Sequence, residues 1–245
     1  MSLEKGYTVP ILGQGYVRYI DHLGSDQRIV ETARISYKSP SKGDEADKKL
    51  LFYLFKNRHT SPFESCNITF NIKMPIFCMR QFVRHRTFRF NEWSGRYSEL
   101  ADEFYIPTTW RPQDTKNKQS SIEVENWNPT VELFDHDGVI ANNATDALKY
   151  IYEQAYICYQ AMLKAGIAKE LARIVLPVSM FTEIYINVDV HNLIHFLGLR
   201  QDAHAQLEMR VIADAMASIA EELFPWTFEA RKKYKFMVVE QESLS

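Results

Sequence analysis

Cysteine and glycine are both scarce in this sequence. Its 245 residues include three cysteines, Cys66, Cys78 and Cys158, and no two of them form a C-x-x-C pair. An odd number of cysteines without paired spacing argues against a disulfide framework and a cysteine-based zinc site, and it suits a reducing compartment. The nine glycines form no complete glycine-rich phosphate loop, so neither a Rossmann nor a P-loop nucleotide site is expected.

Long hydrophobic runs and an excess of charge are also missing. No apolar run approaches the roughly 18 residues that a membrane helix needs, and MSLEKGYTVP lacks the basic-then-apolar pattern of a signal peptide. We therefore expect a cytoplasmic protein with no membrane partner. The 29 basic and 31 acidic residues give a formal net charge of -2. That balance argues against a protein held to nucleic acid by its overall field, so anions must be bound by local clusters.

The hydrophobic pattern predicts a single α+β domain over residues 1–245, with more helix than strand. The segment SCNITFNIKMP alternates, and Ile68, Phe70, Ile72 and Met74 share one face, which predicts a half-buried strand. The other expected strands lie within 8–24, around a turn at Gly13–Gly15, and at 180–188, and the expected helices lie at 26–37, 45–59, 75–86, 144–166, 189–200 and 203–225. Between 111 and 145 the chain is polar and irregular, which predicts a loop insertion or a lid.

Two motifs that often mark function are incomplete. Gly13-Gln-Gly15 begins like a dinucleotide-binding loop, but Arg18 stands where the third glycine is needed, so a hairpin turn is the better interpretation. His191 and His195 share a helix face, but an asparagine and a glutamine stand where a zinc protease has its glutamate and third histidine. No metal site is expected, and the two histidines can equally line a cofactor pocket.

The stretch QFVRHRTFRFNEWSGRY, residues 81–97, carries four arginines and a histidine but only one acid, Glu92. A solvated helix end would explain one or two of these arginines, but not all four. Ser94 and Gly95 offer a hydroxyl and a flexible backbone that can surround an oxyanion, and Arg96 can bind it bidentately. The stretch therefore predicts a site for more than one phosphate.

Two further arginines lie in apolar surroundings far along the chain. They are Arg173 in ELARIVLP and Arg200 in FLGLRQDAH. An arginine in such surroundings is either paired with an acid or functional, and both alternatives remain open at this point.

The residues RHRTFRFNEWSGRY resemble the signature R-H-R-x-x-S-x(4)-S-x-R-Y of flavin-dependent thymidylate synthases and match six of its seven specified positions. Flanking blocks that resemble the family in the same order are ARISY, HTSPFE, ARIVLP, HNLIHFLGLRQDAHAQ and PWTFEA. The resemblance implies a homotetramer with active sites at subunit interfaces and a small mixed or antiparallel sheet with several long helices. It also implies that dUMP is converted to dTMP with FAD, 5,10-methylenetetrahydrofolate and NADPH, and without a cysteine nucleophile.

The same resemblance implies roles for individual residues. Arg200 would face the uracil and stabilise negative charge as N3 loses its proton, which makes C5 nucleophilic. The residues expected to bind dUMP are Gln81, Phe82, Val83, Arg84, Glu92, Trp93, Ser94, Gly95, Arg96, Arg173 and Arg200. The residues expected to bind FAD are Ser36, His59, Ser61, Glu64, Arg84, His85, Arg86, Glu92, Asp189, Val190, His191, His195 and His204.

The sequence departs from the family pattern at a few positions. Arg89 replaces the first serine of the signature and adds a charge near the expected phosphates. Asp189, Val190 and His191 stand where the family commonly has an asparagine and a basic residue near FAD, and His195 replaces an asparagine. An aspartate beside a phosphate would repel it.

A different class of function uses the same cluster. Phe88, Phe90 and Trp93 lie among the basic residues between Arg84 and Arg96. Aromatic rings between cations can stack on bases, so a nucleic-acid-binding module is the alternative hypothesis. The net charge of -2 counts against it.

Overall fold

The computed structural model describes residues 3–118, 120–136 and 138–234. Its strands are β1 (Thr8–Ile11), β2 (Gly15–Leu23), β3 (Asn67–Pro75), β4 (Arg89–Glu92), β5 (Leu133–Asp135), β6 (Gly138–Ala141) and β7 (Phe181–Asp189). Its α-helices are α1 (Asp26–Arg34), α2 (Asp44–Lys56), α3 (Ile76–Phe82), α4 (Ala144–Lys164), α5 (Lys169–Ala172), α6 (Val190–Arg200), α7 (Leu207–Leu223) and α8 (Pro225–Tyr234). Single 3₁₀ turns are η1 (Ile35–Tyr37), η2 (Phe63–Ser65) and η3 (Arg173–Val175).

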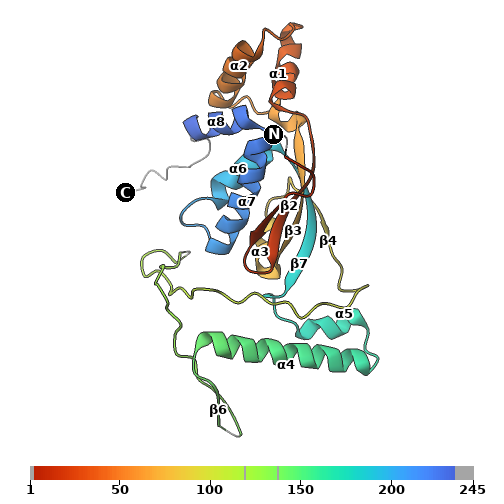
Figure 1. Ribbon diagram of the computed structural model, residues 1–245, viewed down its shortest axis with the longest axis vertical. Helices are drawn as coiled ribbons and strands as arrows, with labels where there is room; N and C mark the ends of the chain where they lie inside the picture. The colour runs from red at the N-terminus through yellow and green to blue at the C-terminus, as the bar shows by residue number, and fades with distance from the viewer. Residues whose placement is uncertain (1–2, 119, 137, 235–245) are drawn as a thin grey trace.

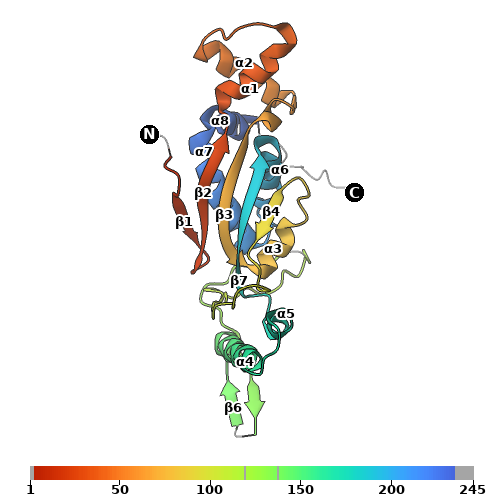
Figure 2. The same cartoon turned by 90° about the vertical axis from the view of Figure 1, so that its right-hand side faces the viewer.

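Five strands form one antiparallel sheet in the order β1-β2-β3-β7-β4. Helices α6 and α7 lie along one face of this sheet, and the other face carries no helix in the described chain (Figure 2). The molecule is elongated, with α1 and α2 beyond one end of the sheet and α4 and α5 beyond the other (Figure 1). None of the described helices has the length and apolar character needed to cross a bilayer.

The core lies between the sheet and α6 and α7. Every second residue of β3, from Ile68 to Met74, is fully buried, as the alternation predicted. These side chains lie opposite buried residues of β7, for example Ile68 opposite Val188 and Phe70 opposite Ile186. Such directly opposed apolar pairs are the unit of sheet stabilisation. The strand is more than half-buried, because Asn71 on its other face is also fully buried.

The face of the sheet without helices is polar. Asn71 accepts a hydrogen bond from the Tyr16 hydroxyl at 3.1 Å and donates one to Glu183 at 2.9 Å. Asn187 donates to the Thr69 hydroxyl at 2.9 Å. These contacts satisfy the amide groups and keep this side of the sheet ordered.

Most predicted elements are present, with corrections at their ends. The expected hairpin around Gly13–Gly15 is confirmed as β1 and β2. The helix expected over 75–86 ends at Phe82, with Pro75 as its N-cap, so Arg84 to Arg86 lie in the following turns. The helix expected over 26–37 ends at Arg34 and continues as η1.

Three other features of the structure differ from the expected elements or add to them. Strand β4 was not predicted, and it pairs with β7 at the edge of the sheet. The last expected helix, over 203–225, is present as α7, which begins at Leu207 and ends at Leu223, and the helix that follows it, α8, was not predicted. The described residues of the segment 111–145 are largely irregular and contribute a two-stranded hairpin, β5 and β6, before α4.

Replacing Ile68 by alanine should lower the free energy of unfolding by about 2–5 kcal/mol, because it leaves a cavity in the centre of the core. Leu23 is the matched control, since it is an aliphatic residue of the same size that is 58% exposed. Its replacement by alanine should change stability by no more than about 0.5 kcal/mol. Urea denaturation of both variants measures the difference, and equal losses would mean that β3 does not carry the core.

Candidate active site

The end of α3 meets the end of α6 at Arg200. The guanidinium of Arg200 donates from Nε to Nε2 of His85 at 3.2 Å and from Nη1 to Oε1 of Gln81 at 3.0 Å. Gln81 lies in the last turn of α3, and His85 follows in a turn closed by its amide on the Phe82 carbonyl at 2.8 Å. The two segments are 115 residues apart along the chain, so this contact is a product of the fold and not of local sequence.

An aromatic cluster holds His85 in place. Phe82 stacks on Phe196 with ring centroids 4.9 Å apart, and Phe88 lies 5.3 Å from Phe196. The imidazole of His85 meets the Phe196 ring edge-on at 4.9 Å. Since Phe82, Phe88 and Phe196 are all buried, the ring of His85 has little freedom to rotate.

The charge of Arg200 is not neutralised by a nearby acid. Burial, followed by the neighbouring charges of Arg200 and His195, lowers the pKa of His85 from 6.5 to about 4. His85 is therefore neutral at physiological pH and accepts a hydrogen bond, as the neutral amide oxygen of Gln81 also does. Within the part of the chain that the structure describes, no carboxylate forms an ion pair with Arg200. The remaining N–H groups of this guanidinium can serve an anion from outside.

A second basic group surrounds the turn Ser94–Tyr97. The amide of Arg96 donates to the Ser94 hydroxyl at 3.3 Å, and the amide of Tyr97 donates to the Ser94 carbonyl at 3.1 Å. A side chain at Gly95 would place its Cβ 3.0 Å from Leu100, which is tight. The turn is thus compact because Gly95 has no side chain.

Helix α5 lies beside this turn and brings Arg173 into the same region. Lys169 donates to the Tyr97 carbonyl at 3.2 Å, and Arg96 lies 3.5 Å from the Glu170 carboxylate. Both side chains of the Arg96–Glu170 pair are about half exposed, so the pair is weak and an incoming anion can replace the acid. Arg173 begins η3, directly after α5.

Glu92 and Trp93 line a pocket of about 430 Å³ on the polar face of the sheet. The Thr182 hydroxyl donates to the Glu92 carboxylate at 2.7 Å, and the amide of Trp93 donates to the Glu183 carbonyl at 2.8 Å. Strand β4 therefore fixes both residues against β7. Thr182 was missed by the sequence analysis, because a threonine in a strand gives no signal of function.

Three of the residues expected on the flavin side, His59, Val190 and His191, lie around the start of α6. His59 and His191 line the same small pocket, together with Phe63. Val190 is fully buried and its amide donates to the Cys66 carbonyl at 2.9 Å. Val190, like Phe82, therefore supports the site by packing in the core.

Asp189 caps α6. Its carboxylate accepts from the amide of Asn192 at 2.8 Å and from the Asn192 side chain at 2.7 Å. The helix N-terminus also carries partial positive charge, which offsets the negative charge of a capping aspartate. The repulsion expected between Asp189 and a phosphate is weakened by these contacts.

The remaining predicted residues lie near the surface. Arg89 donates to the Asn187 amide oxygen at 3.1 Å on the polar face of the sheet, and His204 is held by Asp202 at 2.9 Å. The exposed residues are Ser36, His59, Ser61, Glu64, Val83, Arg84 and Arg86. Among the described residues, no group of three or more His, Cys, Asp and Glu side chains is arranged to hold a metal ion.

Comparison with known proteins identifies the family. Residues 18–226 match the family described as thymidylate synthase complementing protein. A flavin-dependent thymidylate synthase from Thermus thermophilus is 41% identical over 232 residues, which cover 95% of this chain and 81% of that protein. The corresponding protein of Thermosipho africanus is 42% identical over 226 residues, which cover 92% and 94%. The chain belongs to the flavin-dependent thymidylate synthase family.

Solved structures agree with this family assignment. A crystal structure of the UMP/dUMP methylase PolB from Streptomyces cacaoi bound with 5-Br dUMP has a TM-score of 0.74 and 33% sequence identity. The similarity covers 90% of this chain and 95% of that one. A second structure of PolB, bound with 5-Br UMP, has a TM-score of 0.73. The α+β fold and the assignment as a thymidylate synthase are confirmed.

The pKa of His85 makes the stability of this family member depend on pH. A histidine whose folded pKa lies below its ordinary value of 6.5 takes up a proton on unfolding, so its contribution is fully present above pH 6.5. That contribution is lost as the pH falls towards about 4. A His85→Gln variant, which keeps an acceptor but cannot titrate, should therefore lose less stability between pH 7 and pH 5. Urea denaturation at both pH values measures this, and parallel losses would show that His85 does not titrate abnormally.

Proposed function

We propose that this family member converts dUMP to dTMP by reductive methylation, with FAD as cofactor and without a covalent enzyme adduct. The methylene group comes from 5,10-methylenetetrahydrofolate, and NADPH supplies the reducing equivalents. The observation that supports the mechanism best is Arg200, a partly buried cation whose two protein partners, His85 and Gln81, are both neutral.

Arg200 has the surroundings that an electrostatic catalyst requires. The C5 carbon of uracil becomes nucleophilic when N3 loses its proton and the ring carries negative charge. A cation that is already oriented stabilises this charge without reorganisation, and the effect is strongest where water is excluded. Burial lowers the pKa of Arg200, but an arginine stays protonated at any working pH. Its charge is therefore available to the substrate throughout the reaction.

The phosphate of dUMP is assigned to the turn at Ser94, Gly95 and Arg96. The Ser94 hydroxyl accepts from the Arg96 amide and keeps its own proton to donate, and Arg96 needs only to exchange Glu170 for the phosphate. Arg173, placed by the adjoining α5, adds a second cation. Arginine and hydroxyl donors together match the geometry of a phosphate monoester.

The residues near the start of α6 and after α3 fit FAD. Arg84 and Arg86 are exposed, and within the described chain no carboxylate pairs with either, so their guanidinium groups suit its diphosphate. His59 and His191 share a pocket and offer ring surfaces to an aromatic group. When bound, FAD supplies the hydride that completes the methyl group.

A homotetramer with shared active sites is the assembly that we propose. His85, which contacts Arg200, precedes β4 along the chain and the phosphate turn follows β4, so we infer that two copies each contribute one half of a site. Exposed apolar side chains of α4, α5 and the residues that follow α5 support an interface at that end of the molecule. They are Ile151, Ile157, Leu171, Ile174 and Val178.

Removal of the Arg200 side chain tests the mechanism. Arg200→Ala should reduce dTMP formation by about 10²–10³-fold, the typical effect of losing one oriented donor to developing charge. The variant should still bind dUMP, though more weakly, and should keep the absorption spectrum of bound FAD. Arg28→Ala, which removes an exposed arginine from a weak surface pair, is the control. Unchanged turnover in Arg200→Ala would refute this role.

Arg96 is tested by the binding of dUMP alone. A charge-assisted contact contributes about 1.5–3 kcal/mol, so Arg96→Ala should weaken dUMP binding roughly 10- to 150-fold. Glu170→Gln is a control of opposite direction, because it frees Arg96 and should not weaken binding. Calorimetric titration of both variants decides the question, and equal affinity in Arg96→Ala would remove this residue from the phosphate site.

The nucleic-acid-binding alternative rested on the local basic and aromatic cluster alone. Family membership favours the enzyme, since the same arginines lie within the family signature and two of the aromatic residues are accounted for by packing. Phe88 is buried against Phe196, and Phe90 packs against the core.

A further inference from the structure

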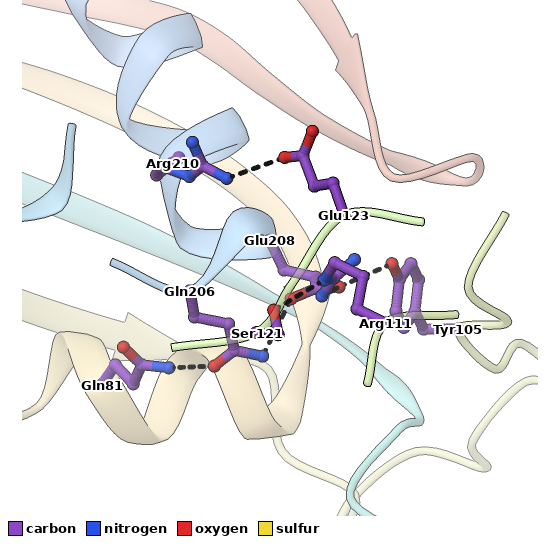
Figure 3. Close-up of polar contacts among 8 residues, drawn as sticks. All are labelled: Gln81, Tyr105, Arg111, Ser121, Glu123, Gln206, Glu208 and Arg210. Atoms are coloured by element: carbon purple, nitrogen blue, oxygen red, sulfur yellow. Dashed lines mark hydrogen bonds and ion pairs between the residues drawn. The ribbon is translucent and has the colours of Figure 1, made fainter. Parts of the chain in front are cut away.

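A row of hydrogen-bonded side chains links Arg200 to the segment before the β5–β6 hairpin. Gln81, which accepts from Arg200 at 3.0 Å, donates from its amide nitrogen to the Gln206 amide oxygen. Gln206 donates in turn to Oε2 of Glu208 at 2.9 Å. The other oxygen of Glu208 accepts from Arg111 at 2.7 Å (Figure 3). Four elements of the fold thus meet in one continuous network.

The ends of this row fix its direction. Arg200 can only donate hydrogen bonds, and an ionised Glu208 can only accept them. Gln206 must therefore turn its NH₂ group towards Glu208 and its oxygen towards Gln81. Gln81 must then turn its NH₂ group towards Gln206, which leaves its oxygen facing Arg200. Every amide in the row has a single orientation that satisfies both neighbours.

Glu208 is suited to fix this direction because it is buried and ionised. Its side chain is 3% exposed, and that of Arg111 is 14% exposed. Burial alone would raise the pKa of Glu208, but the hydrogen bonds from Arg111 and from neighbouring donors bring this pKa below its ordinary value. Tyr105, whose pKa is raised by burial and by Glu208, stays protonated and donates to the same carboxylate at 3.0 Å.

The segment that carries Arg111 is fastened to α7 by two ion pairs of opposite sense. Arg111 of the segment binds Glu208 of α7, and Arg210 of α7 binds Glu123 of the segment at 3.3 Å (Figure 3). Arg111 also donates to the Ser121 hydroxyl at 3.1 Å, which closes the segment on itself. This part of the long irregular region therefore has a defined position over the start of α7.

We propose that Glu208 and Gln206 are positioning residues for Arg200, and that the segment carrying Arg111 holds them in place. The carboxylate of Glu208 sets the orientation of both glutamine amides, so the Gln81 oxygen stays directed at the Arg200 guanidinium. This inference rests on the proposed role of Arg200 in the methylation of dUMP. It gives a function to Arg111, which no part of the proposed mechanism otherwise uses.

Glu208→Gln tests the direction of the row while keeping its shape. Arg111 and Tyr105 still require an acceptor, so the new amide turns its oxygen to them and its NH₂ group to Gln206. The amide groups of Gln206 and Gln81 must then turn over. Gln81 presents its NH₂ group to Arg200, which has no acceptor for it. We expect the kcat for dTMP formation to fall roughly 10-fold or more, since a charge-assisted bond to Arg200 is lost. The KM for dUMP should change much less. A kcat equal to that of the wild type would overturn the proposal.

Gln206→Met separates positioning from folding. Gln206 is exposed, so methionine interrupts the row without burying or exposing a charge, and the thermal midpoint should stay close to that of the wild type. Its kcat should fall, but by less than that of Glu208→Gln, because Gln81 loses its anchor without being forced to present a donor to Arg200. The double variant should be no slower than the slower single variant, because either change alone already breaks the row. Losses that multiply in the double variant would overturn the proposal and show that Glu208 acts through general stability.

Glu123→Gln is the matched control. It makes the same chemical change in the second ion pair between the segment and α7, the pair with Arg210, which is not part of the hydrogen-bonded row. Its kcat should be that of the wild type, and a loss like that of Glu208→Gln would overturn the proposal. Arg200→Ala is measured alongside, so that a failure of the positioning role can be distinguished from a failure of the proposed function. An inactive Arg200→Ala with a fully active Glu208→Gln would refute only the positioning role. A fully active Arg200→Ala would refute the proposed function itself.

Discussion

The structure depends on one uncompensated charge, the guanidinium of Arg200. Proteins seldom leave a partly buried cation without an acid, because the cost of removing it from water is then recovered only through hydrogen bonds. Here both bonds go to neutral acceptors, the His85 ring and the Gln81 amide. An ion pair would satisfy the cation equally well, but it would also cancel the field on which the proposed role of Arg200 depends. The neutral partners keep the cation in place and leave its charge effective.

The topology of the sheet explains why these residues meet. Strands β3 and β7 run antiparallel over their whole length, from the Asn67–Asp189 pair to the Pro75–Phe181 pair. Helix α3 leaves one end of this ribbon and α6 leaves the opposite end, so the two helices run towards each other along the same face. Their C-terminal ends meet over the core, where Phe82 and Phe196 stack. The contact between His85 and Arg200 follows from this packing.

The sequence predicted those parts of the molecule that local pattern determines. The alternation in β3 and the apolar faces of the helices identified most elements, and the signature residues from Arg84 to Tyr97 identified the family. Strand β4 was missed because its four residues are mostly polar and owe their conformation to pairing with β7. Gln206 and Glu208 were missed because polar residues at the start of a helix ordinarily face solvent.

One signal for Glu208 was nevertheless present. In α7 it precedes Ile212 by one turn, and Ile212, Met216 and Ile219 form the buried face of the helix. An acid on the apolar face of a helix requires a partner. The identity of that partner, Arg111, could not be read from the sequence, because 97 residues separate the two and no repeat or spacing relates them.

The distance between Glu208 and Arg200 resolves a conflict between orientation and charge. A carboxylate in direct contact with Arg200 would orient it firmly, but at about 4 Å the attraction between unit charges reaches several kcal/mol even when the surroundings are polarisable. That energy would oppose any transfer of the guanidinium to an anionic ring. The two glutamine amides between the charges transmit the preferred orientation of the hydrogen bonds, but little of the electric field of the carboxylate. Arg111 balances the negative charge of Glu208. The same arrangement explains why a long, irregular segment is anchored by a buried ion pair.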